Sequence, residues 1–385
     1  MLAAHDKKFL HAILSLGAEH DAVQKILSAF GSFEKAWRSG AAGLERAGIS
    51  SELAQGIASA KNEINPDAEM RKLIAAGISI VGADDPEFPR PLHEISACPV
   101  ALYIKGRFRN DLPHLAVVGT RKATAYGREA ARKIIRELAS ETDIAIVSGL
   151  AQGIDAEAHH AALEAGIPTI GVLGGGMDRA SFFPPENWQL AEQMTAAGGA
   201  VISEYPPGTP ALKHHFPARN RIIAGLCRGV LVVEAPERSG ALITARFAVE
   251  ENRDVFAIPG PLFSPNTAGV HRLIQDGAKL VAGADDIIEE LGLTRRTLHQ
   301  KMGTVLTPLE TRAMGAAGAR SALSLTGLTD ETERTILTLL GEPVSVDEIK
   351  EKTNMPTPAI ISCLSLLELK GIVRPMGQNK FQRIT

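Results

Sequence analysis

Short apolar runs alternate with helix-length polar-and-apolar segments from about residue 67 to residue 292. The runs are rich in β-branched residues, as buried parallel strands are. In chain order they are ISIVG, LAVVG, IAIVSG, PTIGVLGGG, AVISE, GVLVVEA and DVFAIPG. Segments such as YGREAARKIIRELAS and SGALITARFAVEENR lie between them. This alternation predicts an α/β domain over residues 66–292, built on a doubly wound parallel sheet.

The residues before this domain have a helical pattern. Three segments, near residues 6–16, 21–29 and 51–63, are separated by turns that contain glycine. They predict a small N-terminal bundle over residues 1–65, of the SAM or helix-hairpin-helix type. Such a bundle either contacts a DNA backbone or, in the commoner case, serves as a structural cap. Residues 66–112 contain one helix, one strand and a proline-rich stretch, which we expect to extend the edge of the sheet.

The C-terminal part of the chain has a different pattern. Residues 293–329 have no periodicity and carry five lysines and arginines against Glu310, so we interpret them as a basic linker. Three helical segments and the hairpin-like IVRPMGQNKFQRI follow, which together predict a winged helix-turn-helix over residues 330–385. Its recognition helix, residues 357–370, has only Glu368 and Lys370 as charges. A helix that reads the major groove needs more polar side chains, so a protein contact is favoured over tight duplex binding.

Composition and charge place few limits on the partners. The chain of 385 residues is 45% hydrophobic and 22% charged, as soluble globular proteins are, and its net charge is −3. Any basic surface must therefore be local. Cys98, Cys227 and Cys363 are isolated, which is typical of reduced thiols in a cytoplasmic protein. The N-terminus is amphipathic and not a signal peptide, and no apolar run is long enough to span a membrane.

Candidate binding residues follow the strands. In an open α/β sheet, ligands bind beyond the carboxyl ends of the strands, where these loops meet. Backbone N–H groups at the starts of helices favour anions there. The loops that could hold a phosphate contain Ser148, Gly149, Gly153, Gly174, Gly175, Ser239 and Gly240. A dinucleotide is disfavoured, because Gly119 is next followed by Gly127 and no GxGxxG exists; a Walker A sequence is also missing.

The stretch HHFPARNRIIAGL, residues 214–226, has cations where a helix disfavours them. Pro217 suits a first helical turn, and the macrodipole opposes Arg219 and Arg221 there by roughly 0.3–1 kcal/mol each. Either carboxylates neutralise them or an anion binds. Residues 204–228 hold four cations against Glu204, and Arg121 and Lys122 add to this basic groove. Phe216 could stack on a base of single-stranded DNA or form a hydrophobic staple on its own helix.

Six motifs in this order resemble the DprA/Smf DNA-processing family. They are VVGTRKATAYG, VSGLAQGIDAEAHHAAL, SEYPPGTP, HHFPARNRIIAGL, VVEAPERSGALITARFA and VFAIPG, which span about residues 80–290. The resemblance implies an extended Rossmann-like domain that binds single-stranded DNA, forms a homodimer and loads a RecA-type recombinase during natural transformation. The implied DNA contacts are Gly119, Arg121, Lys213, Phe216, Arg219, Asn220 and Arg221. The implied dimer and recombinase surface, residues 269–281, contains His271, Ile274 and Leu280.

Other readings of these residues stay open. Arg219 and Arg221 could form ion pairs with Glu204 or Glu234, and Arg221 is the better candidate. Asp155 and Ser239 begin helices and could be N-caps. The pairs His159–His160 and His214–His215 lack ligand partners at a metal-binding spacing, so we expect no metal and no cofactor. Ser148 has no His–Asp arrangement that would make it a nucleophile.

An enzyme is the main alternative to a binding protein. Some Rossmann-fold phosphoribohydrolases bind a nucleotide monophosphate on a PGGxGTxxE loop, and RSGALITARFAVE occupies the corresponding place. The residue three positions after Thr244 is Phe247, and the next carboxylate is Glu250. The loop is thus present without its catalytic acid, which indicates a nucleotide-binding fold used without chemistry. A transcription regulator led by the winged helix is a third, weaker hypothesis.

Overall fold

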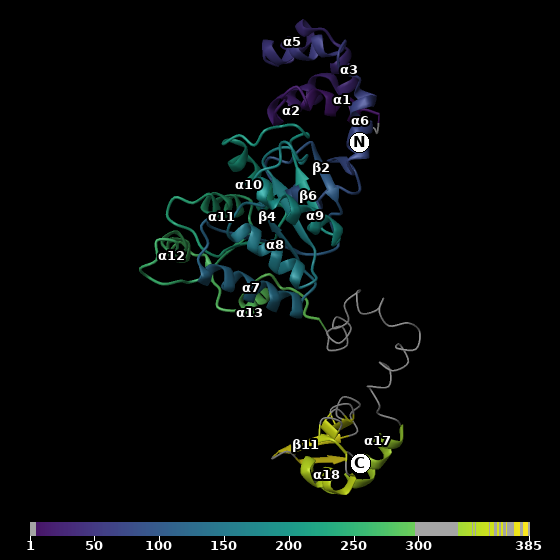
Figure 1. Cartoon of the computed structure of the whole chain (residues 1–385), viewed down its shortest axis with the longest axis vertical. Coiled ribbons are helices and arrows are strands. Elements are labelled where there is room, and N and C mark those ends of the chain that lie inside the picture. The colour runs from purple at the N-terminus through teal and green to yellow at the C-terminus, as the bar shows by residue number, and fades with distance from the viewer. Residues whose placement is uncertain are drawn as a thin grey trace. The chain divides into compact units, whose positions relative to one another are not determined.

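The computed structural model describes two compact units of this chain, within residues 1–301 and 302–385 (Figure 1). It describes residues 5–296 and 330–383, apart from residues 341, 343, 354, 358, 359, 362, 365, 366, 368–372, 378 and 379. Most of the predicted linker, residues 297–329, and the charges Glu368 and Lys370 of the recognition helix lie outside these ranges. Each unit is described by itself.

The first unit contains a nine-stranded sheet in the order β1-β2-β6-β5-β4-β3-β7-β8-β9. Its strands are β1 Ile78–Gly82, β2 Ala101–Gly106, β3 His114–Val118, β4 Ala145–Ser148, β5 Thr169–Leu173, β6 Ala200–Ser203, β7 Gly229–Val232, β8 Asp254–Ala257 and β9 Lys279–Leu280. The seven strands from β6 to β9 in this order are parallel. The predicted doubly wound α/β sheet is confirmed.

The sheet is mixed rather than purely parallel, which corrects the prediction at one edge. β2 runs antiparallel to both β1 and β6. The connection from β1 to β2 holds only the short 3₁₀ helix η1, Arg90–Glu94, and no crossover helix. A parallel pairing needs such a crossover, whereas an antiparallel one does not. The predicted extension of the edge by residues 66–112 is present, with β2 as a second strand that the pattern did not predict.

Alternate residues of each strand face opposite layers of helices. Leu115 and Val117 of β3 pack in a core with α7 (Ala125–Glu141), α8 (Ile154–Glu164) and α13 (Ala284–Glu290). Ala116 and Val118 pack in a second core with α10 (His215–Gly225) and α11 (Gly240–Glu250). Two further helices are α9 (Trp188–Ala196) and α12 (Ala268–Gln275) (Figure 1). The sheet is thus covered on both faces, as a parallel sheet requires.

The order of the strands reverses at β3, which lies between β4 and β7. From β3 the chain proceeds through β4, β5 and β6 on one side and through β7, β8 and β9 on the other. The loops that leave β3 and β7 at their carboxyl ends therefore diverge and leave a crevice between them. This is the position at which open α/β sheets bind their ligands.

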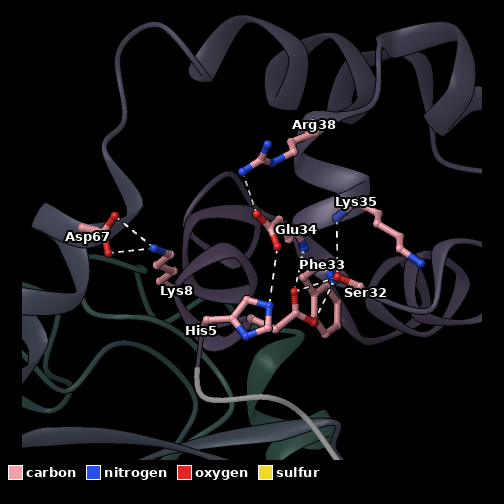
Figure 2. Close-up of polar contacts among 9 residues, drawn as sticks. His5, Lys8, Ser32, Phe33, Glu34, Lys35, Arg38 and Asp67 are labelled. Carbon is pink, nitrogen blue, oxygen red and sulfur yellow. Dashed lines mark hydrogen bonds and ion pairs between the residues drawn. The ribbon is translucent and has the colours of Figure 1, made fainter.

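The N-terminal bundle is larger than predicted. Two short helices, α3 (Phe33–Arg38) and α4 (Ala41–Arg46), stand between the predicted ones, α1 (Lys7–Leu14), α2 (His20–Phe30) and α5 (Ser51–Ala60), and α6 (Pro66–Ala75) follows. The buried Asp6 carboxylate accepts hydrogen bonds from Ser32 Oγ and the N–H groups of Phe33 and Glu34, at 2.7–3.0 Å; Figure 2 labels the three donor residues. These bonds satisfy the free donors at the start of α3.

The bundle and the edge of the sheet share one hydrophobic core. Leu10 and Ile57 of the bundle belong to the same buried cluster as Ile80 of β1 and Tyr103 of β2. His11 Nδ1 lies 2.9 Å from the Tyr103 hydroxyl within this core. Burial lowers the pKa of His11 to about 4. The ion pair of Lys8 with Asp67, at 2.8 Å, also joins α1 to α6 (Figure 2).

The second unit contains helices and a small antiparallel sheet. Its described elements are α17 Asp330–Leu339, β10 Val344–Ser345, α18 Val346–Thr353, β11 Val373–Gly377 and β12 Lys380–Arg383, and the sheet order is β10-β12-β11. The predicted hairpin corresponds to β11 and β12. The described residues of the third predicted helix are helical, and Ile360, Leu364 and Leu367 lie in the core with Ile336 and Ile349.

Two cations of the predicted linker belong to the first unit. Arg295 pairs with Asp285 at 2.6 Å, and Arg296 pairs with Asp143 at 2.7 Å. The described start of the segment is therefore neutralised locally instead of forming a free basic stretch. Among the residues that the structure describes, no helix combines the length and the apolar character needed to cross a membrane.

Candidate nucleic-acid interface

Helix α10 begins at His215, so Pro217 is its third residue. A proline so near the start removes no hydrogen bond within the helix, because the first N–H groups have no partner there. The helix places Arg219 and Asn220 in the interior and Arg221 at the junction with the N-terminal bundle. The three residues that share one motif therefore have different surroundings.

Arg219 is buried, with 5% of its surface exposed. Its guanidinium donates to the carbonyl oxygens of Gly149, at 2.8 Å, and of Val172. These carbonyls lie at the carboxyl ends of β4 and β5. Burial lowers the pKa of Arg219 to about 10, against the opposing effect of the Asp155 charge. Backbone carbonyls and a nearby carboxylate thus compensate this cation.

The backbone N–H and carbonyl of Gly149 link Asp155 to Arg219. Its N–H donates to Asp155 Oδ2 at 3.1 Å, while its carbonyl accepts from Arg219. A Cβ at this position would lie 2.7 Å from both side chains, so only glycine fits. Asp155 was expected to cap its helix. Instead Gly153 is the N-cap of α8, and the Asp155 carboxylate binds the N–H groups of the preceding loop.

Arg221 forms the predicted ion pair with Glu204, and its guanidinium also donates to the Ala97 carbonyl at 2.7 Å. Burial alone would raise the pKa of Glu204, but the hydrogen bond from His20 and the charge of Arg221 bring it below its usual value. Glu234, the other carboxylate considered, binds the N–H and hydroxyl of Thr124 at 2.9 and 2.6 Å. Arg221 is therefore held by the interior and by the bundle.

The remaining predicted cations face solvent. Arg121, Lys122 and Lys213 are all exposed. The Arg121 guanidinium carbon lies 5.3 Å from the centre of the Phe216 ring, within cation–π range. Phe183 meets Phe216 edge to face at 5.9 Å and is 45% exposed. Arg121, Phe216 and Phe183 thus form one surface group, which we call the aromatic–arginine cluster.

Two pockets adjoin this cluster. The first, of about 310 Å³, lies between the loop after β3 and the start of α11, and Gly119, Asn220 and Arg238 contribute to its lining. The second, of about 230 Å³, lies between residues 149–152 and residues 183–186. Arg121, Ala151 and Phe216 line both pockets. The cluster therefore forms the wall between two neighbouring hollows at the carboxyl edge of the sheet.

The predicted phosphate loops divide into two groups. Ser239 and Gly240 line the first pocket, and Ser239 caps α11 by accepting from the Ala241 N–H at 3.2 Å, as expected of an N-cap. In the other loops the polar donors have internal partners. Ser148 Oγ donates to the Val117 carbonyl at 2.6 Å, and the Gly149 N–H is bound by Asp155. These two residues thus have protein partners where a phosphate was expected.

The other predicted glycines allow close packing. A Cβ on Gly153 would lie 2.3 Å from the Thr120 carbonyl oxygen, so this glycine lets the loop after β4 approach the loop after β3. Gly174 and Gly175 are buried and lie against the segment that leads into α10. These three glycines are not in the lining of either pocket beside the cluster, and the first pocket receives its helix N-terminus from α11.

The predicted partner surface lies at the β9 edge of the sheet. Leu280 is in the last strand and is 45% exposed, and Ile274 is half-buried on α12. His271 Nε2 lies 3.1 Å from the Gly260 carbonyl oxygen. None of these three residues lines the two pockets beside the cluster. A partner bound at this edge would therefore leave both pockets unoccupied.

One group of possible metal ligands exists among the described residues of the two units. Glu19 from the bundle lies beside His214 and His215, with the three ligand atoms within 4.8 Å of one another. His215 Nδ1 is also 3.2 Å from the Gly174 carbonyl oxygen. The expectation of no metal was based on sequence spacing, which could not reveal Glu19. These three residues are the ones that could hold an ion.

The structure places the residues on which the enzyme alternative depends in different surroundings. Thr244 is buried in the lining of the first pocket, as the alternative requires. Glu250 does not line that pocket and pairs on the helix surface with Arg246 at 2.9 Å. Asp155 does line it, but this carboxylate is already bound by two backbone N–H groups. Both of these N–H groups donate to Asp155 Oδ2.

Phe183 and Arg238 are site residues that the sequence reasoning missed. Phe183 follows Gly174–Gly176 in the same loop, in the segment SFFPPEN. In a chain with only 4% aromatic residues, two consecutive phenylalanines in a loop were a usable signal. Arg238 directly precedes the predicted cap Ser239, and this position beside a helix start was the signal that the sequence offered for it.

Comparisons with known proteins match two stretches of the chain. The model of the family described as DNA recombination-mediator protein A matches residues 79–292, and that of the DprA winged helix domain matches residues 319–379. Protein Smf of Synechocystis is 35% identical over 379 residues, with 94% of each chain covered. DNA processing protein DprA of Streptococcus pneumoniae is 50% identical over 206 residues, which cover 53% of this chain and 71% of that one. The X-ray structure of the Streptococcus pneumoniae protein superimposes with a TM-score of 0.61 and 38% identity, over 74% of this chain and 97% of that one.

Proposed function

Because this chain belongs to the DprA/Smf family of DNA-processing proteins, we propose that it binds single-stranded DNA across the aromatic–arginine cluster. The observation that carries the proposal is the position of Arg121 and Phe216 in the wall between two pockets. An unpaired base can enter a pocket and stack on a ring, while the neighbouring guanidinium binds the phosphate. In a duplex the bases are paired and stacked on one another, so no base is available to stack on the rings of the protein.

The charges near the cluster suit a polyanion. Arg121, Lys122, Lys213 and Arg238 are exposed along the carboxyl edge of the sheet or at the start of α10. The dipoles of α10 and α11 add partial positive charge at the same edge, so phosphates replace water and mobile anions there. Of the predicted contacts, Gly119 and Asn220 line a pocket, and Asn220 is bound to the Gly240 carbonyl and to Arg219.

We assign different roles to the two remaining arginines of the motif. Arg219 holds the ends of β4 and β5 together, and Arg221 joins α10 to Glu204. The Arg219 guanidinium carbon lies 6.0 Å from the centre of the Phe216 ring, and both guanidiniums have protein partners, so we assign both arginines to holding α10 in place. Their proposed role is to hold the helix that carries Phe216, without contacting the DNA.

The finer part of the proposal concerns assembly. A homodimer formed through His271, Ile274 and Leu280 would present two DNA sites and pass the strand to a RecA-type recombinase during natural transformation. On this account the chain is a mediator and not an enzyme, it acts in the cytoplasm, and it needs no cofactor. The winged helix would serve as a protein contact.

The test is a fluorescence anisotropy titration of labelled oligothymidylate, with matched duplex as competitor, over a series of salt concentrations. The proposal predicts binding that duplex does not displace, and affinity that falls steeply with salt. Equal competition by duplex, or an affinity that does not change with salt, would contradict it. Size measurement of the wild type and of Leu280→Arg checks the dimer, which this substitution should dissociate.

A further inference from the structure

The loop after β8 carries the most exposed large apolar side chains in the described part of the chain. Leu262 is 76% exposed and Phe263 is 95% exposed. The Ser264 N–H bonds to the Pro261 carbonyl at 3.0 Å, so these two residues are the central pair of a tight turn. Such positions usually hold glycine, asparagine or aspartate. An aromatic ring at this position exposes apolar surface to water, which a bound partner would cover.

The turn is fixed to the edge of the sheet that carries the DNA site. The Asn266 side-chain amide donates to the Lys122 carbonyl at 3.0 Å, and the Ala235 N–H donates to the Asn266 carbonyl at 2.7 Å. Thr267 Oγ1 donates to the Pro261 carbonyl at 2.7 Å, and the Tyr126 hydroxyl donates to the Pro259 carbonyl at 2.5 Å. These bonds fix the backbone of the turn, on which the Phe263 ring is exposed.

The position of the turn continues the line of the two pockets. The strand order β5-β4-β3-β7-β8 puts the loop of β8 two strands beyond the loop of β3, which is about 10 Å at the usual strand spacing. Lys122 lies directly after Arg121 and is bonded through its carbonyl to this same loop. An exposed cation thus stands between the aromatic–arginine cluster and Phe263. Tyr126, also exposed, is bonded to the start of the loop.

We propose that Phe263, with Leu262 beside it, is a second stacking position, which binds a base of the same strand after that strand has passed Arg121 and Lys122. This proposal rests on the proposed function. Single-stranded DNA is favoured as the occupant because the turn continues a line of exposed cations. Alternating cations and rings are the arrangement that tracks a strand without reading its sequence.

The proposal predicts a dependence on DNA length. A short oligothymidylate fills only the cluster, whereas a longer one also reaches the turn. Phe263→Ala should therefore weaken binding of long oligonucleotides about tenfold and leave binding of short ones unchanged. The melting temperature should not change, because the side chain is almost fully exposed. Ile74→Ala, an exposed apolar position on α6, is the matched control and should affect neither length.

The fluorescence of a tryptophan placed in the turn measures stacking directly. In Phe263→Trp, long oligothymidylate should quench the added emission, relative to the wild type with its own Trp37 and Trp188, and short oligothymidylate should not. Equal affinity of Phe263→Ala and wild type at every length, together with no quenching, overturns the proposal. A change in oligomeric state of the Leu262→Ala/Phe263→Ala variant, with unchanged DNA affinity, also overturns it and identifies the turn as a protein contact.

Different results would contradict the proposed function and the second stacking position. If wild type binds no single-stranded DNA, the proposed function fails and the second stacking position fails with it. If wild type binds and Arg121→Ala weakens binding while Phe263→Ala does not, only the second position fails. The length series therefore separates the two results within one experiment.

Discussion

The arginines of α10 and the cations of the loop after β3 lie near the same helix start and have opposite roles. Arg219 is 5% exposed and binds the carbonyls that end β4 and β5, whereas Arg121 is exposed and lies over the Phe216 ring. The difference comes from the partners of each guanidinium. Arg219 donates to backbone carbonyls and belongs to the interior, whereas Arg121 faces solvent beside a ring and is available to an external anion.

Residues of the α10 motif can be needed for DNA binding without touching the DNA. Arg219 and Arg221 fix the helix that carries Phe216, and Gly149 and Asp155 fix Arg219. Loss of any of these groups moves the ring that is proposed to stack. A variant in this set would lose DNA binding through a loss of structure, and a DNA-binding assay alone would not separate the two causes.

The largest effect that the comparison predicts is on stability. Arg219→Ala should lower the free energy of unfolding by about 3–5 kcal/mol, because it removes one partner of a buried ionic group and leaves Asp155 without a cation. Thermal or urea unfolding measures this loss. Arg238→Ala, an exposed arginine at the same pocket, is the control and should unfold as wild type does. Unchanged stability of Arg219→Ala would contradict the structural role.

The next largest effect is on DNA affinity without a change in stability. Arg121→Ala should weaken binding of single-stranded DNA by about 2 kcal/mol, or about thirtyfold, since a hydrogen bond to a charged group is lost. Its melting temperature should equal that of wild type because the side chain is exposed. Anisotropy titration measures the affinity. Arg246→Ala, which is paired with Glu250 on α11, is the matched control and should bind normally.

A smaller effect distinguishes stacking from a hydrophobic staple at Phe216. Phe216→Leu keeps an apolar side chain on the helix but removes the ring, and should cost about 1 kcal/mol of DNA affinity. Phe216→Tyr keeps the ring and should bind as wild type does. If both variants bind DNA as tightly as wild type, Phe216 is a hydrophobic staple on α10 and does not stack on a base.

An effect of similar size, which depends on pH, is expected at the ion pair of Arg221 with Glu204. The pKa of Glu204 is lowered in the folded protein, so its stabilising contribution is complete above its usual value and is lost as the pH falls through the lowered one. Glu204→Gln should therefore be less stable than wild type at neutral pH, by about 1 kcal/mol. The difference should vanish in acid. Urea unfolding at both pH values checks this, and an unchanged difference in acid would contradict it.

The sequence predicted the parts that depend on local pattern. Buried strands, the carboxyl edge and the exposed Arg121 follow from hydrophobic period and from the rule for open sheets. The burial of Arg219 could not be predicted, since its partners Gly149 and Val172 are separated from it by tens of residues. The same reason hid Phe183 beside Phe216 and Glu19 beside His214. Contacts between distant segments, and not residue types, decided these roles.

The most direct test of the central claim is the salt dependence of single-strand binding by wild type and by Arg121→Ala/Lys213→Ala. The account predicts that the slope of log affinity against log salt flattens by about 0.7 for each lost phosphate contact, while both proteins unfold at the same temperature. An identical slope in the two proteins would contradict it, and would mean that the exposed cations at this edge do not bind the DNA backbone.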